Sequence, residues 1–99
     1  MQVSVEQQRP LSFLAGCVVC VSGFNPEDKL VLKGMVEMCG GIYMDDMDCR
    51  TVTYLLSLTM NSEKAKHAVR WGVPVLSHQW LFDCIFERRF RSINDYLLH

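Results

Sequence analysis

The feature that most constrains this chain is an unbroken apolar run, Cys17-Val18-Val19-Cys20-Val21, which lies between Gly16 and Ser22-Gly23. A strand with one face in water alternates apolar and polar residues, whereas this run does not alternate. The run therefore predicts a strand that is buried on both faces, at the centre of a parallel sheet. Helices are then needed on both sides of that sheet to cover it.

A helix is predicted directly after this strand. Asn25 is suited to the N-cap, Pro26 to the first helical position and Glu27-Asp28 to the acidic first turn. We expect the helix to reach about Cys39, because the Gly40-Gly41 pair that follows permits left-handed backbone. Residues at helical spacing predict its buried stripe: Leu30, Val31, Met35, Val36 and Met38.

The remaining segments continue the alternation of strands and helices. We expect strands over 42–44, 51–58 and 73–76, a helix over 63–71 capped by Asn61 or Ser62, and a helix over 78–88 capped by Ser77. The resulting order, β-α-β-β-α-β-α, predicts an α/β fold with a parallel sheet covered on both faces.

Three further apolar sets are assigned to these elements and to the C-terminal segment. The second helix is expected to bury Ala65, Ala68 and Val69, and the third Trp80, Leu81, Cys84 and Ile85. The last ten residues are expected to be irregular and to be anchored by Phe90, Ile93 and Tyr96.

Size and charge limit the kind of protein this chain can be. The 99 residues, 49% hydrophobic with a net charge of −1, predict one domain over 12–99 and a linker over 1–11 that ends at Gln7-Gln8-Arg9-Pro10. No secretory signal is recognised at the N-terminus, so we expect the chain to be cut from a longer protein. The near-neutral charge makes nucleic acid an unlikely direct ligand, and no apolar run is long enough for a membrane.

The cysteines favour packing over chemistry. Five scattered thiols are typical of reduced cysteines in a cytosolic or nuclear protein. Cys17 and Cys20 should point to opposite faces of their strand, so they should not share a metal, and we expect neither a metal nor a cofactor. Three carboxylates within four positions could suggest calcium binding: Asp45, Asp46 and Asp48. The spacing of an EF-hand loop is missing, so a solvated turn is favoured.

No catalytic arrangement is recognised. The three histidines are isolated from any nucleophile or carboxylate at a familiar spacing, and we expect that the chain is not an enzyme: His67, His78 and His99.

Three polar groups can instead converge on an anion. Ser22-Gly23 ends the first strand, and Lys64 lies just inside the start of a later helix. At the carboxyl ends of neighbouring parallel strands, a hydroxyl, an unobstructed N–H and an ammonium can meet at one phosphate. Taken singly, Ser22-Gly23 is an ordinary turn and Lys64 an ordinary exposed lysine.

Several segments together resemble the BRCT domain, the breast-cancer C-terminal repeat. They are residues 16–24, Gly40-Gly41, Thr53-Tyr54-Leu55-Leu56, and Trp80 with Cys84 four positions later. The resemblance covers about residues 12–97. Tyr54 departs from the family, which usually has His at that position of the strand.

Within this family, the chain is most similar to the N-terminal, phosphopeptide-binding repeats of topoisomerase-II-binding checkpoint scaffolds. Three segments carry the likeness: Val21-Ser22-Gly23-Phe24 with Lys29, residues 40–44, and Lys64 through Ala68-Val69-Arg70-Trp71. The resemblance implies a four-stranded parallel sheet in the order 2-1-3-4. It also implies two helices, the first and third, on one face and the second helix on the other.

The resemblance also implies a binding site at the crevice where the strand order reverses. Ser22, Gly23 and Lys64 would bind the phosphate, with Lys29 as a second basic contact. A cation in the first turn of a helix is unfavourable for the helix dipole, which makes a ligand-facing role for Lys29 more plausible. Ser62 can contribute a further hydroxyl to the phosphate site or act only as an N-cap. Trp71 can line a peptide groove or be an exposed surface residue without a role in binding.

The expected function is that of a module that binds phosphoserine or phosphothreonine segments in a nuclear scaffold of the DNA damage response or replication checkpoint. The alternative is a phosphate-independent interaction domain that pairs with an adjacent BRCT repeat or a partner helix. A basic cluster near the C-terminus can contact acidic partners or a DNA backbone, although a solvated surface is favoured: Arg88, Arg89 and Arg91.

Overall fold

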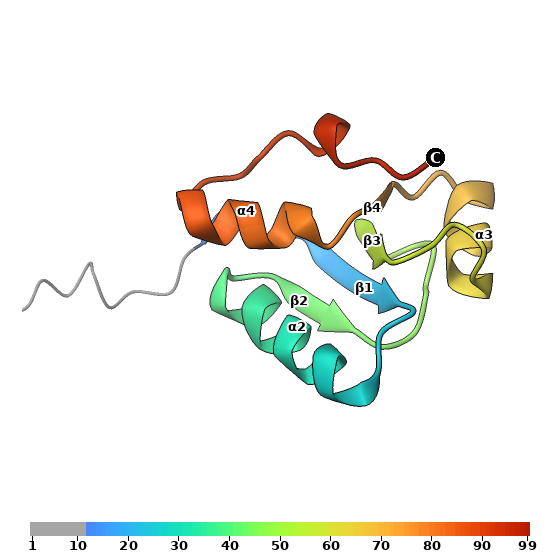
Figure 1. Ribbon diagram of the computed structural model, residues 1–99, viewed down its shortest axis with the longest axis horizontal. Coiled ribbons are helices and arrows are strands. Elements are labelled where there is room, and N and C mark those ends of the chain that lie inside the picture. Colours follow the sequence, from blue (N-terminus) through green and yellow to red (C-terminus); the bar gives the residue numbers. More distant parts are fainter. Residues whose placement is uncertain (1–11) are drawn as a thin grey trace, which may run out of the picture.

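The computed structural model describes residues 12–99, which form a parallel sheet between two layers of helix (Figure 1). The strands are β1 (Val18–Ser22), β2 (Ile42–Met44), β3 (Tyr54–Ser57) and β4 (Val75–Leu76), in the order β2-β1-β3-β4. The helices are α2 (Pro26–Met38), α3 (Glu63–Arg70), α4 (Gln79–Glu87) and the short 3-10 turn η1 (Ile93–Asp95). The predicted fold class and strand order are confirmed, and the linker expected over 1–11 lies outside the described residues.

Strand β1 is the centre of the sheet, as its unbroken apolar run predicts. It pairs with β2 on one side and β3 on the other. Val19 and Val21 belong to the core beneath α2 and α4, and Cys20 belongs to the core beneath α3. Cys17 packs against the first of these cores, so Cys17 and Cys20 do lie on opposite faces.

Two strands are shorter than predicted, because turns use the backbone groups that a longer ladder would need. Ahead of β3, the N–H groups of Thr51 and Val52 donate to the Asp48 carbonyl at 3.1 and 2.9 Å. Ahead of β4, the Val73 N–H donates to the Ala68 carbonyl at 2.8 Å, which closes the end of α3.

The buried stripe predicted for α2 is largely wrong. Leu30, Val31 and Met38 are exposed, whereas Leu32 and Val36 are buried and continue to the buried Cys39 at helical spacing. Helix α2 is apolar around much of its circumference, so periodicity alone allows two faces. The predicted start is confirmed: Asn25 is the N-cap, and its Oδ1 accepts the Asp28 N–H at 2.8 Å.

The other two helices bury most of the predicted residues. Ala65 and Ala68 are buried in α3, but Val69 is 59% exposed. Trp80, Leu81 and Cys84 are buried in α4, with Ile85 half-buried. Helix α4 begins at Gln79 after His78, whose side chain makes no cap bond, while Ser77 Oγ accepts the Gln79 N–H at 3.2 Å.

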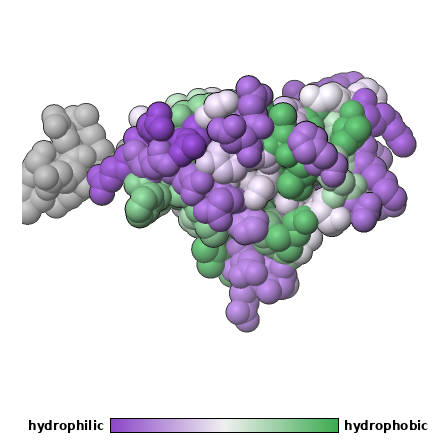
Figure 2. Space-filling view, turned by 45° about the horizontal axis from the view of Figure 1, so that its top comes forward, coloured by the Kyte–Doolittle hydropathy of each residue, from purple (hydrophilic) through white to green (hydrophobic). Residues whose placement is uncertain are grey.

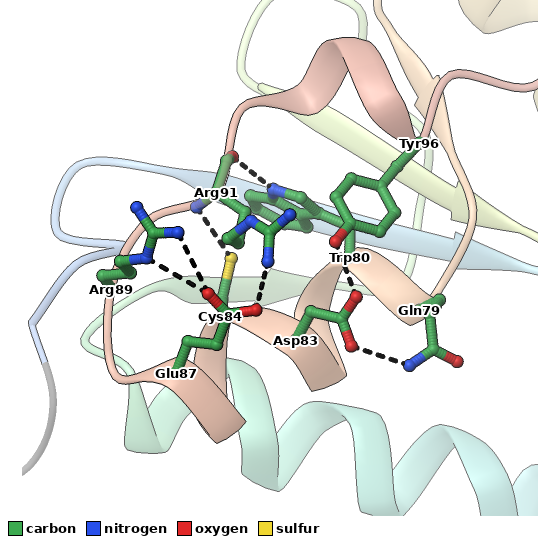
Figure 3. Close-up of polar contacts among 8 residues, drawn as sticks. All are labelled: Gln79, Trp80, Asp83, Cys84, Glu87, Arg89, Arg91 and Tyr96. Atoms are coloured by element: carbon green, nitrogen blue, oxygen red, sulfur yellow. Dashed lines mark hydrogen bonds and ion pairs between the residues drawn. The ribbon is translucent and has the colours of Figure 1, made fainter.

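The C-terminal segment is held across α4 by side chains (Figure 3). The buried Trp80 indole donates to the Arg91 carbonyl at 2.9 Å, and the Tyr96 hydroxyl donates to Asp83 Oδ2 at 2.6 Å. Leu97 then forms an antiparallel bridge with Leu76 at the β4 edge. Ile93 and Tyr96 pack against the core as expected, and Phe90, although 42% exposed, has its ring centroid 5.6 Å from that of the buried Trp80.

Candidate functional site

Three of the predicted polar residues meet at the carboxyl end of β1. Ser22 is the last residue of β1, and Ser62 is the N-cap of α3, the helix that follows β3. Ser22 Oγ donates to Ser62 Oγ at 2.7 Å, across 40 positions of sequence. Since neighbouring parallel strands end at the same edge of the sheet, topology brings the end of β1 and the start of α3 to the same side of the molecule. We call Ser22, Ser62 and Lys64 the polar corner.

The ammonium of Lys64 completes the polar corner. Lys64 Nζ donates to the Val21 carbonyl at 3.3 Å and to the Asp45 carbonyl at 2.5 Å. These contacts hold the charge one residue from Ser22. Both acceptors are neutral, and within residues 12–99 Lys64 forms no ion pair with a carboxylate. Its positive charge is therefore positioned but not neutralised.

The two hydroxyls of the corner retain a hydrogen-bond donor. Ser62 Oγ accepts from Ser22 and from the Ala65 N–H at 3.1 Å, which confirms Ser62 as the N-cap. The pair has two protons and uses one in its mutual bond, so one O–H remains for a ligand whichever way the protons rotate. Ser57, at the end of β3, differs because its hydroxyl is occupied by Thr59.

The neighbouring buried groups are neutral. Burial raises the pKa of the Cys20 thiol, and the Lys64 charge only partly opposes this effect. Burial is also the main reason that the pKa of Tyr43 is raised to about 12, with Asp45 adding to it. Within the described residues, the Lys64 ammonium therefore lies beside neutral groups and forms no ion pair.

The other predicted site residues take no part in the side-chain hydrogen bonds of the polar corner. Gly23 follows Ser22 with a φ of +88°, which leads the chain out of β1 in a conformation that favours glycine. Lys29 is half-buried in the first turn of α2, and its side chain makes no hydrogen bond or ion pair within residues 12–99. Trp71 is 60% exposed at the far end of α3, about 13.5 Å from Ser62 along the helix.

The acidic loop and the arginine cluster take part in local hydrogen bonds and ion pairs of the chain itself. Asp45, Asp46 and Asp48 are exposed in a loop where Asp48 Oδ1 accepts the Arg50 N–H at 2.9 Å. Across residues 12–99, no three His, Cys, Asp or Glu side chains gather as a metal ion would require. In the arginine cluster, Arg89 and Arg91 both pair with Glu87 (Figure 3).

One feature was missed from the sequence: a cavity of about 160 Å³ beside the start of α2 and α4. Its lining comes from three separate segments: Phe24, Asp28, Val31, Leu32, His78 and Phe82. No local motif signals it, because the cavity depends on how α2 and α4 sit against each other. Within the described residues, no helix has the length and apolarity needed to cross a bilayer.

Comparison with known proteins agrees with this architecture. The model of the twin BRCT domain family matches residues 17–80. Protein ECT2 of Homo sapiens is 32% identical over 96 residues, which cover 89% of this chain and 10% of ECT2. The S-M checkpoint control protein rad4 of Schizosaccharomyces pombe is 28% identical over 75 residues, or 76% of this chain and 11% of rad4. The chain thus spans about a tenth of the length of either relative.

Solved structures give the same result in three dimensions. The crystal structure of Rad4 BRCT1,2 in complex with a Crb2 phosphopeptide matches with a TM-score of 0.82 and 25% identity, covering 89% of this chain and 48% of that chain. The corresponding complex with a Mdb1 phosphopeptide matches with a TM-score of 0.83. Since the family model covers well over half of the residues and the fold agrees, this chain belongs to the twin BRCT domain family.

Proposed function

We propose that this domain binds a phosphoserine or phosphothreonine segment of a partner protein at the polar corner. The observation that carries the proposal is the meeting of the Ser22 and Ser62 hydroxyls beside the unneutralised Lys64 ammonium. The likeness to Rad4 BRCT1,2, whose structures contain Crb2 and Mdb1 phosphopeptides, supports the same reading. Like the BRCT family, the domain would act as an interaction module and not as an enzyme.

The chemistry of the corner suits a phosphate better than a carboxylate. A phosphoryl group has close to two negative charges and three acceptor oxygens. The free O–H of the serine pair, the Gly23 N–H and the Lys64 ammonium can each serve one of these oxygens. On binding, Lys64 would exchange two neutral carbonyls for an anion, which is a stronger, charge-assisted hydrogen bond. The N-terminus of α3, the positive end of its dipole, lies at Ser62 and would also attract the phosphate.

Lys29 and Trp71 would contact the ligand outside the phosphate. Lys29 is on the α2 side of the corner and can neutralise the phosphate or an acidic residue beside it. Trp71 offers an exposed ring at the end of α3, which an extended ligand would reach about four residues from its phosphorylated residue. By its relatives, the domain would work in a nuclear scaffold of the DNA damage response or replication checkpoint.

The test is a titration of a fluorescent phosphothreonine peptide library against its unphosphorylated copy, read by anisotropy. We expect micromolar binding of phosphorylated peptides alone and its loss in Lys64→Glu. Lys66→Glu is the matched control, because Lys66 is an exposed lysine two positions along the same helix. Equal affinity for both peptide forms would reject the proposal.

A second function is favoured by a different observation, the apolar side chains that α2 and α4 expose. Leu30, Val31 and Phe86 are 70%, 58% and 88% exposed. On the face seen in Figure 2, green apolar patches are separated by purple hydrophilic ones, so a partner would contact several small apolar patches there and not one continuous surface. Pairing with an adjacent BRCT repeat through α2 and α4 would be indifferent to Lys64→Glu, which distinguishes it from phosphate binding.

A further inference from the structure

The cavity beside α2 and α4 is a partly open pocket whose lining begins two residues after Ser22 of the polar corner. Phe24 follows Ser22 by two residues, and Asp28 and Val31 line the pocket from the first turns of α2. His78 and Phe82 line it from the start of α4. A volume of about 160 Å³ suits one long side chain but not a helix or a second domain. We call this cavity the Phe24 pocket.

Three aromatic rings in contact with one another belong to the lining of the Phe24 pocket. The Phe24 and His78 rings are 5.4 Å apart with an interplanar angle of 82°, and the His78 and Phe82 rings are 5.4 Å apart at 85°. Such edge-to-face contacts hold each ring in place. The π-faces of aromatic rings are negative, so they attract a cation that lies against them.

The charged lining of the pocket is a carboxylate. Asp28 is exposed, and its side chain forms no ion pair within residues 12–99. Its backbone N–H, not its carboxylate, takes part in the cap of α2. Val31 and the buried Leu32 supply aliphatic surface on the same helix. The pocket thus combines an apolar wall, aromatic rings and one unpaired negative charge.

We propose that the Phe24 pocket binds a long basic side chain, lysine or arginine, of the same ligand segment whose phosphate binds the polar corner. Methylenes would lie on Val31 and Leu32, and the cation would lie between Asp28 and the rings. This inference rests on the proposed function, because it assigns the residue that accompanies the phosphate. Phe24 and Ser22 are at most about 7 Å apart along the chain, so the basic residue lies within about four positions of the phosphorylated one.

Charge complementarity favours a basic occupant over an apolar one. The ligand would present an anion and a cation to Lys64 and Asp28, two groups of opposite sign that have no ion-pair partner on the described part of the chain. An apolar side chain would fill the same volume but would gain no charge interaction with the Asp28 carboxylate.

The experiment is an anisotropy titration with fluorescein-labelled phosphothreonine peptides in an alanine-rich background. Lysine, arginine or norleucine is placed in turn at each position from −4 to +4. We expect one position at which lysine or arginine binds about tenfold more tightly than norleucine. Asp28→Asn should abolish this preference and leave the affinity for the all-alanine phosphopeptide unchanged.

The matched control is Glu27→Gln, which removes the same charge from the same helical turn but not from the pocket lining. It should retain the preference. The proposal is overturned if norleucine binds as well as lysine and arginine at every position, or if Asp28→Asn keeps the preference. Comparing the lysine and arginine arms shows which basic residue the pocket selects.

A second measurement separates this proposal from the proposed function. N-acetyl-lysine methylamide and its norleucine analogue are titrated into the isotope-labelled protein, and the ring signals of Phe24 and Phe82 are followed by NMR. Shifts caused by the lysine compound alone support the pocket even if no phosphopeptide binds. Absence of these shifts, together with no basic preference in the peptides, overturns the inference while leaving phosphate binding intact.

Discussion

The polar corner and the network around Glu87 both join distant segments through polar side chains, but they treat charge in opposite ways. In the network, Glu87 pairs with Arg89 at 3.1 Å and also with Arg91, while Asp83 accepts from Gln79 and Tyr96 (Figure 3). In the corner, Lys64 contacts only carbonyl oxygens. Charges that pair internally fix the C-terminal segment to α4, whereas an ammonium without a counter-charge is available to a ligand.

The largest expected effect tests this contrast by reversing one charge in each region. Lys64→Glu should weaken phosphopeptide binding about 100-fold, because it removes a charge-assisted contact and adds repulsion. Its melting temperature should stay close to that of the parent protein. Arg91→Glu should do the opposite, lowering the melting temperature without changing the affinity. Anisotropy and thermal melts of both variants provide the measurement, and equal behaviour of the two would abolish the distinction.

The next effect concerns the buried attachment of the C-terminal segment. Trp80→Phe removes the hydrogen bond from the indole to the Arg91 carbonyl and leaves unfilled volume in the core. We expect the free energy of unfolding to fall by about 2 kcal/mol. Urea denaturation measures this change. A loss of phosphopeptide affinity in the folded variant would show that the two regions are coupled, contrary to expectation.

A smaller effect on the free energy of unfolding is expected from replacing two glycines, one beside the polar corner and one inside α2. Gly23→Ala should lower the free energy of unfolding by about 1 to 2 kcal/mol, because φ is +88° there, although the new Cβ would meet Leu58 only at an ordinary 3.5 Å. Gly34→Ala, inside α2 with nothing within 4 Å, should raise it by about 0.5 to 1 kcal/mol. A stabilising Gly23→Ala would contradict the strained turn.

The smallest effect is a pH dependence in the network. Hydrogen bonds from Tyr96 and Gln79 lower the pKa of Asp83 below its ordinary value of 3.8. The ionised form is therefore favoured by folding, so its contribution is present above that ordinary value and is lost as the pH falls through the lowered one. The melting temperature of the parent should exceed that of Asp83→Asn near neutral pH, and the gap should close in strong acid. A gap that widens with acidification would reverse the assigned sign.

The sequence predicts those features that local rules determine. The unbroken run of β1 implied burial on both faces, Asn25 was predicted as an N-cap, and Ser62 was one of two N-cap candidates beside Asn61. The approach of Ser22 to the start of α3 also followed from topology, because parallel strands β1 and β3 end at one edge. Their ends at Ser22 and Ser57 lie side by side in the register.

The features that escaped prediction depend on competition between elements. Helix α2 has apolar residues on two sides. Only packing against the sheet determines that Leu32 and Val36 are buried while Leu30 and Val31 are exposed. The Phe24 pocket requires the mutual placement of α2 and α4, which no local pattern contains. The bond between the Ser22 and Ser62 hydroxyls depends on side-chain rotamers, so the sequence suggested their proximity but not their contact.

The bridge between Leu76 and Leu97 has a consequence for self-association. Together with the Leu98 N–H, which donates to the Val75 carbonyl at 2.9 Å, it occupies the outer edge of β4 with the chain's own backbone. A strand edge with unpaired backbone N–H and C=O groups can pair with a strand of another molecule. At the opposite edge, β2 offers only three residues, so growth of fibrillar stacks by sheet extension has little backbone to begin from.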